Sequence, residues 1–119
     1  LMWKNVILAF AFLTASVQAK GPVETVHFAR GTTGTVLQGA VLRGEINTYI
    51  LGAARGQTIT VSISSVENNA YFDLVNPSGN LMQQEAQSAN MRLPANGNYR
   101  LLIGSSRGNA TYKVKVTIK

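Results

Sequence analysis

The chain has 119 residues, a formal net charge of +6 and no cysteine. Its length suits one domain with one hydrophobic core. The lack of cysteine excludes a fold held by disulfide bonds and fits the periplasm better than a harsh extracellular setting.

The first 19 residues have the order of a secretory signal peptide. Lys4 provides a positive start, residues 6–13 form an unbroken apolar run, and the segment ends on the small residue Ala19. The run is shorter than the roughly 20 apolar residues of a membrane span. We therefore expect cleavage after Ala19, a mature domain over residues 20–119, no membrane span after cleavage, and a periplasmic or secreted location. A buried helix or an uncleaved anchor is the alternative.

The segment 20–119 alternates apolar and polar side chains with a period of two, as in Ile59, Val61 and Ile63. This period is typical of half-buried strands, and no stretch after Ala19 keeps a helical period over ten residues. Residues 80–90 are the least regular stretch and are expected to form a loop or a frayed edge strand. We predict eight strands, over residues 23–29, 34–43, 45–53, 57–65, 69–75, 88–93, 98–104 and 110–118.

Short connections rich in glycine, asparagine and proline separate these strands. Arg43-Gly44 and Arg55-Gly56 predict tight turns, because glycine readily takes a positive φ. Residues 76–80 predict a β-turn and residues 94–98 a hairpin connection built on Asn-Gly. The sequence thus predicts an all-β fold, an antiparallel β-sandwich of about eight short strands after a cleavable signal peptide, with a small barrel as the nearest variant.

The segment 20–119 offers few groups for catalysis. Its single histidine, His27, alternates with Val26 and Phe28, which favours a surface histidine on a strand over a catalytic one. A triad with Asp73 is formally available, but no nucleophile turn is present. The carboxylates are well separated and show no metal-ligand spacing. We expect no enzyme, no cofactor and no metal site, and a small hydrolase is the least favoured hypothesis.

Binding through the turns is a better-supported hypothesis. An arginine precedes a glycine at Arg30, Arg43, Arg55 and Arg107. The guanidinium is a planar fork suited to carboxylates, and loops on a rigid sandwich are common recognition sites, although any single turn arginine is most simply a solvated charge. Arg107 is favoured because hydrogen-bonding side chains surround it. The candidate binding residues are Arg43, Asn47, Tyr49, Ser105, Ser106, Arg107 and Asn109.

Motifs along almost the whole mature segment resemble the periplasmic inhibitors of g-type lysozyme. They include Val-His-Phe-Ala-Arg-Gly at residues 26–31, Gly-Glu-Ile-Asn-Thr-Tyr at 44–49, Ala-Arg-Gly-Gln at 54–57 and Leu-Pro-Ala-Asn-Gly-Asn-Tyr at 93–99. Several of these motifs are shared with bacterial pre-peptidase C-terminal (PPC-type) β-sandwich domains. They are turn and core motifs, so they indicate a fold more directly than a function.

The resemblance implies a protein that inserts basic and hydroxyl-bearing loops into the substrate cleft of a lysozyme or related lytic enzyme. The alternative is a non-catalytic PPC-type module of the cell envelope that binds peptidoglycan or another anionic glycan. The net positive charge suits either partner. An exported protein does not meet nucleic acid, so we expect none as a partner.

Overall fold

The computed structural model describes residues 19–28 and 32–119, and within these residues the chain forms nine strands. None of the described residues forms a helix capable of crossing a membrane. The strands are β1 (Ala19–Thr25), β2 (Gly34–Val41), β3 (Glu45–Ala53), β4 (Thr58–Ser65), β5 (Ala70–Val75), β6 (Leu81–Ala86), β7 (Ser88–Arg92), β8 (Gly97–Ser105) and β9 (Ala110–Ile118).

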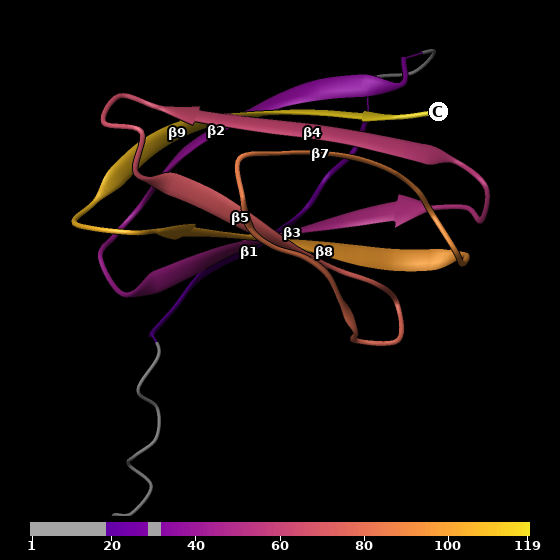
Figure 1. Ribbon diagram of the computed structural model, residues 1–119, viewed down its shortest axis with the longest axis horizontal. Coiled ribbons are helices and arrows are strands. Elements are labelled where there is room, and N and C mark those ends of the chain that lie inside the picture. Colours follow the sequence, from indigo (N-terminus) through magenta and orange to yellow (C-terminus); the bar gives the residue numbers. More distant parts are fainter. Residues whose placement is uncertain (1–18, 29–31) are drawn as a thin grey trace, which may run out of the picture.

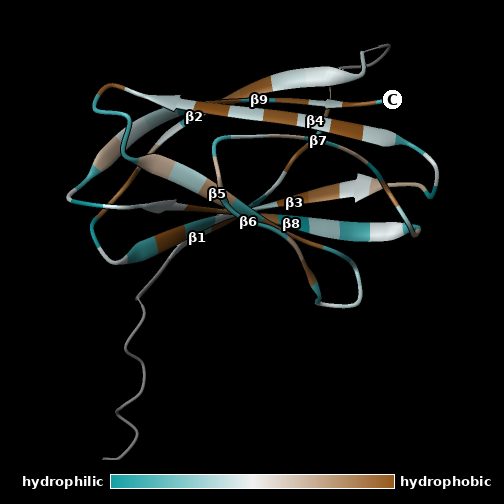
Figure 2. Ribbon diagram, in the orientation of Figure 1, coloured by the Kyte–Doolittle hydropathy of each residue, from teal (hydrophilic) through white to brown (hydrophobic). Residues whose placement is uncertain are grey.

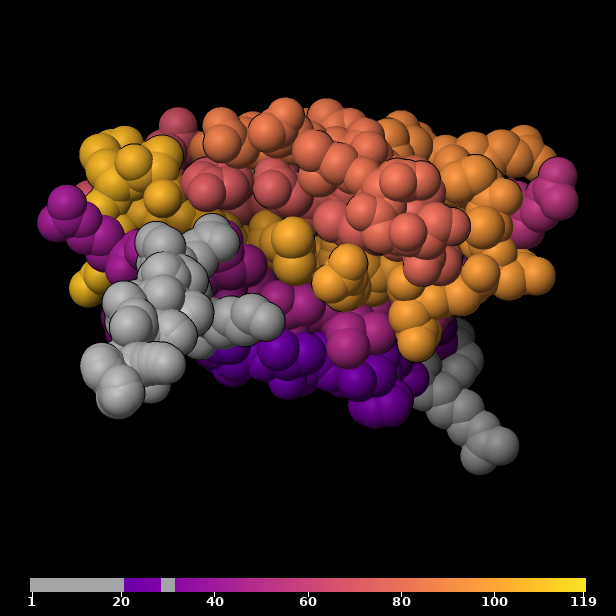
Figure 3. Space-filling view, turned by 90° about the horizontal axis from the view of Figure 1, so that it is seen from below, coloured from indigo at the N-terminus to yellow at the C-terminus, as the bar shows by residue number. Residues whose placement is uncertain are grey.

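The strands form two packed layers, seen edge-on in Figure 1. One layer is a five-stranded sheet in the order β1-β3-β8-β5-β6, and the other is a four-stranded sheet in the order β2-β9-β4-β7. Figure 3 looks at the molecule from the side of the five-stranded sheet, where indigo β1 lies along one margin. The predicted all-β sandwich is confirmed.

The core lies between the sheets because each strand turns alternate side chains inward. The alternation is clearest on β4 and β9, where brown and pale bands follow one another in Figure 2. Side chains from both layers are almost fully buried, and this removal of apolar surface from water stabilises the sandwich. The largest of them are Tyr99, Tyr112, Phe72, Leu51, Ile59, Leu74, Leu93, Leu101 and Ile103.

The first strand differs from the prediction in position and direction. It runs over Ala19–Thr25 and not over 23–29, and it pairs with β3 in parallel, whereas every other strand pair is antiparallel. Parallel pairing needs a crossover, which the chain makes by passing through β2 of the opposite sheet before it returns as β3. His27 therefore follows the strand instead of lying in it, and its side chain is exposed.

The irregular stretch 80–90 contains a strand that was expected only as a loop or a frayed edge. β6 is the edge of the five-stranded sheet, and its register with β5 shifts twice. Glu85 has a φ of 46°, and its backbone N–H donates to Asp73 Oδ1 at 2.6 Å. An edge strand with such a bulge needs no apolar alternation, which explains its polar sequence.

The predicted signal peptide falls almost wholly on residues 1–18, outside the described residues. Ala19, the predicted cleavage residue, is the first residue of β1. Cleavage after Ala19 would therefore remove one residue from this strand and leave its pairing with β3 from Lys20 onward.

Candidate functional site

Three turns gather at one end of the sandwich, at the left of Figure 1. They are the β2–β3 turn (42–44), the β4–β5 turn (66–69) and the β8–β9 loop (106–109). Asn109 Oδ1 accepts a hydrogen bond from the Arg43 N–H at 2.7 Å, and the Ser106 N–H donates to the Asn69 carbonyl at 2.8 Å. These bonds join the three turns into one surface, which we call the loop end.

Asn69 holds the loop end together from the inside. Its side chain is 3% exposed, and Nδ2 donates to the Arg107 carbonyl at 2.8 Å and to the Asn109 carbonyl at 3.1 Å. Its own backbone N–H donates to Ser65 Oγ at 3.0 Å. One buried amide therefore fixes the β8–β9 loop against the β4–β5 turn.

Arg107 is exposed and its guanidinium is directed across the loop end. Nη2 donates to the Glu67 carbonyl at 2.9 Å, and no described carboxylate forms an ion pair with it. Ser105 Oγ donates to the Arg107 and Gly108 carbonyls, and Gly108 takes a φ of 60°. The short loop is thus held in one bend, and Arg107 at its tip is exposed.

Two predicted binding residues lie inside the sandwich instead. Asn47 and Tyr49 are 4% and 6% exposed. Asn47 Nδ2 donates to the Ala40 carbonyl at 2.9 Å and to the Tyr112 hydroxyl at 3.0 Å, and the Tyr49 and Tyr112 hydroxyls share a bond of 2.7 Å. Asn47 Oδ1 is buried without a hydrogen-bond partner. We call the side chains of Asn47, Tyr49 and Tyr112 the buried polar cluster, because their polar atoms bond to one another between the two sheets.

Because Tyr49 lies in the buried polar cluster, we expect the free energy of unfolding to fall at alkaline pH. Burial, followed by the hydrogen bond to Tyr112, raises the pKa of Tyr49 above its ordinary value of 10.0. The folded state then keeps a proton that the unfolded chain releases, so the free energy of unfolding is intact below pH 10 and falls above it. We expect a decline of about 1.4 kcal/mol per pH unit from this one group.

Urea unfolding between pH 8 and pH 12 measures this decline. The pKa of Tyr71 is also raised, first by burial and then by Glu85, so Tyr49→Phe should reduce the slope without removing it. An unchanged slope in Tyr49→Phe would contradict the assignment to Tyr49.

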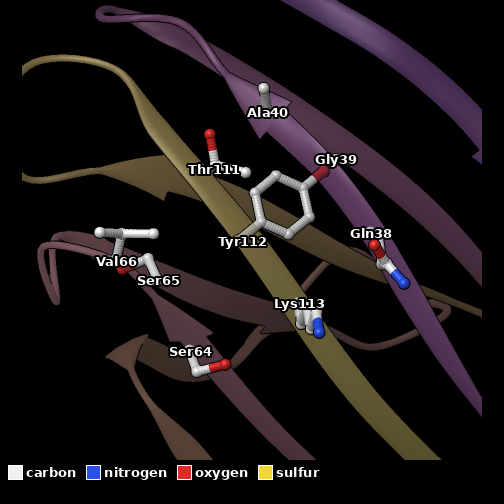
Figure 4. Close-up of a pocket in the computed structure, with 9 residues that line it drawn as sticks. All are labelled: Gln38, Gly39, Ala40, Ser64, Ser65, Val66, Thr111, Tyr112 and Lys113. Carbon is white, nitrogen blue, oxygen red and sulfur yellow. The ribbon is translucent and has the colours of Figure 1, made fainter.

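A shallow hollow of about 600 Å³ opens on the outer face of the four-stranded sheet, beside the loop end. Figure 4 shows its lining on β2, β9 and β4, with the Tyr112 ring reaching toward Gly39. A Cβ at Gly39 would lie 2.7 Å from the Tyr112 hydroxyl, so only glycine leaves this close approach undisturbed. The hollow is lined by Gln38, Gly39, Ala40, Ser64, Ser65, Val66, Thr111, Tyr112 and Lys113.

The turn arginines divide between the two ends of the molecule. Arg43 and Arg107 meet at the loop end, together with Ser105, Ser106 and Asn109. Arg55 lies at the opposite end, where its N–H donates to Asn96 Oδ1 at 2.7 Å. Arg30 lies outside the described residues.

Sequence reasoning missed the β4–β5 turn as part of this surface. Val66 is 90% exposed at its tip, and Glu67 and Asn69 contact the β8–β9 loop. The sequence contained a signal for this turn, because asparagine pairs such as Asn68-Asn69 are common in turns. In the structure Asn68 takes a φ of 55°, as asparagine in a turn can. Among the described residues, no three potential metal ligands gather at this or any other place.

Comparison with known proteins shows similarity to inhibitors of g-type lysozyme in both sequence and structure. No family model matches the chain. An inhibitor of g-type lysozyme from Escherichia coli K12 is 28% identical, over 98% of this chain and 96% of that protein. The crystal structure of Aeromonas hydrophila PliG, a periplasmic inhibitor of g-type lysozyme, is 27% identical with a TM-score of 0.74, covering 86% of this chain and 99% of PliG. The resemblance to these periplasmic inhibitors is therefore confirmed in sequence and fold.

The shared fold with PPC-type domains is also confirmed. The pre-peptidase C-terminal domain of a Bacillus anthracis collagenase has a TM-score of 0.57 at 16% identity, over 88% of this chain and 99% of that domain. At this identity the similarity concerns the sandwich alone, as expected for motifs of turn and core residues.

Proposed function

We propose that this protein is a periplasmic inhibitor of g-type lysozyme. The observation that carries the proposal is the similarity to the Escherichia coli inhibitor over nearly the full length of both chains. The similar protein of known structure is likewise named as a periplasmic inhibitor. A signal peptide over residues 1–19 would deliver the domain 20–119 to that compartment. Inhibition by binding requires no catalytic group of its own.

The loop end is the surface that we propose for contact with the lysozyme. Arg43 and Arg107 present two cations there, and Val66 adds an exposed apolar side chain. Glycoside hydrolases act through carboxyl groups in their substrate cleft, and a guanidinium can pair with a carboxylate through two parallel hydrogen bonds. The Glu67 carbonyl occupies only one nitrogen of Arg107, so the other donors are available to such a carboxylate.

Replacement of Arg107 tests this contact. Arg107→Ala should weaken inhibition of a g-type lysozyme by about tenfold or more, as is common for a central arginine of an interface. The measurement is the rate at which a cell-wall suspension clears, as a function of inhibitor concentration. Arg55→Ala is the matched control, because it removes the same charge from an exposed turn at the opposite end.

Two results would contradict the proposal at different levels. An unchanged inhibition constant in Arg107→Ala would remove this side chain from the contact while leaving the inhibitor function in place. No inhibition by the unaltered protein at tens of micromolar would reject the function itself. Co-sedimentation with purified sacculi in that second case would favour the alternative, an envelope-binding module.

A further inference from the structure

The outer face of the four-stranded sheet carries a row of cations that the proposed inhibitor function does not use. Lys113 and Lys115 point outward from β9, two residues and therefore about 7 Å apart. The register places Gln38 on β2 and Ser64 on β4 on either side of Lys113, and Ser62 on β4 beside Lys115. Lys113 is thus flanked on both sides by neutral groups that can hydrogen-bond, and Lys115 is flanked by Ser62 on β4 and by Val36 on β2.

Negative charge is absent from this face. Among the described residues, the acidic side chains in strands, Glu24, Glu45, Asp73 and Glu85, all belong to the five-stranded sheet, and Glu67 belongs to a turn. No ion pair forms with Lys113 or Lys115 in the described part of the chain. The positive potential of the row is therefore unopposed locally and can attract an anion.

The row leads into the hollow above Gly39. Lys113 and Gln38 stand at its rim, Ser64 and Thr111 add hydroxyl groups, and Ala40 leaves its floor open. Its volume of about 600 Å³ is within the usual range of small-ligand sites. Ala40 and Val66 add apolar surface to this lining, so it suits the apolar face of a sugar ring whose edge carries hydroxyl groups and one negative charge.

We propose that this face binds a glycan strand that carries carboxylate groups, with one sugar in the hollow and its carboxylate on Lys113. The next carboxylate along the strand pairs with Lys115. A lipid surface fits less well, because Val36 and Val66 are the large exposed apolar side chains here and no aromatic side chain of the described strands points outward from this face. The lysines lie on the side of the sandwich, whereas the proposed lysozyme contact lies at its tip, and the two surfaces meet at Val66.

The test is a titration of the exported protein with a galacturonate hexamer, followed by amide chemical shifts. We expect shifts centred on β9 and β4 that weaken as salt is raised from about 50 to 200 mM. A neutral cellulose hexamer should give much weaker shifts. Phosphatidylglycerol vesicles form the third arm, and binding to vesicles without binding to the hexamer would overturn the proposal in favour of a membrane.

Matched variants separate this site from general charge. Lys113→Gln with Lys115→Gln should weaken hexamer binding about fivefold or more. Arg55→Gln with Arg100→Gln removes the same charge from exposed positions elsewhere and should change it less than twofold. Ala40→Glu places a larger, negatively charged side chain in the hollow and should abolish hexamer binding. Equal losses in both double variants, or shifts away from this face, would overturn the assignment.

Glycan binding and lysozyme inhibition are tested by separate measurements, so one proposal can be rejected while the other stands. The hexamer titration contains no lysozyme, so its result does not depend on the proposed inhibitor function. The Lys113→Gln and Lys115→Gln variant should inhibit lysozyme as the unaltered protein does. If inhibition were lost together with glycan binding, the two surfaces would be one, and the separate site would be rejected.

Discussion

Asn69→Ala should lower the free energy of unfolding by about 1–3 kcal/mol, although it removes only a small side chain. The buried amide donates to the carbonyls of Arg107 and Asn109. In the alanine variant the Arg107 carbonyl keeps its bond from Ser105 Oγ, whereas the Asn109 carbonyl loses this donor. Each buried polar group left unpaired costs about 1–3 kcal/mol. Urea unfolding followed by circular dichroism measures the loss.

The same replacement should weaken lysozyme inhibition beyond its effect on stability. Without the amide, the β8–β9 loop keeps its backbone bond from Ser106 to Asn69 but loses both bonds from Asn69 Nδ2, so the bend that carries Arg107 is held less firmly. We expect an inhibition constant about tenfold higher, measured at a temperature where the variant is fully folded. The comparison at that temperature separates poor positioning from unfolding.

Two further variants make the expectation specific to the donors of Asn69. Asn69→Asp keeps the size of the side chain but directs carboxylate oxygens at carbonyl oxygens, so it should destabilise at least as much as alanine. Asn96→Ala removes an exposed asparagine that caps a turn at the opposite end, and should cost 1 kcal/mol or less. A loss below about 0.5 kcal/mol in Asn69→Ala would contradict the role given to its amide.

The strands that alternate strongly could be predicted from sequence. β4 and β9 follow the predicted bounds closely, because the period of two directly reports which face is buried. β1 could not be placed, since residues 19–22 are poor strand formers and their pairing with β3 depends on a segment remote in sequence. β6 lacks the pattern because two register shifts and the positive φ of Glu85 interrupt the alternation of its side chains between the two faces.

The candidate site was predictable only in its local part. The bend at residues 105–109 is encoded by serine, glycine and asparagine side chains that bond within the loop. The position of Asn69 beneath that bend depends on contacts 38 and 40 residues apart, which no local pattern reports. Tyr49, in contrast, alternates with Leu51 toward the core, so the pattern contained the signal for its burial.

Burial separates the first residue of β3 from the polar residues that follow it along the strand. Glu45 begins the strand beside the loop end, whereas Asn47 and Tyr49 lie inward, where their groups bond to Ala40 and Tyr112. These bonds cross from the five-stranded to the four-stranded sheet just below the loop end. The buried polar cluster therefore holds the two sheets together directly beneath the proposed lysozyme contact.

Tyr112→Phe should destabilise the protein more than Tyr49→Phe, by about 2–3 against about 1 kcal/mol. The Tyr112 hydroxyl bonds both the Tyr49 hydroxyl and Asn47 Nδ2, and its removal leaves the Tyr49 hydroxyl buried without a partner. When the Tyr49 hydroxyl is removed instead, the Tyr112 hydroxyl still accepts from Asn47. The penalty for an orphaned group, and not the number of bonds lost, then sets the order.

The double variant and a third tyrosine test this order. Tyr49→Phe with Tyr112→Phe should cost less than the sum of the single variants, because no orphaned hydroxyl remains in the pair. Tyr99→Phe breaks bonds to the Ala95 backbone at the opposite end and should add independently to either variant. Equal losses in Tyr49→Phe and Tyr112→Phe, or strict additivity of the pair, would mean that the two hydroxyls do not depend on each other for their hydrogen bonds.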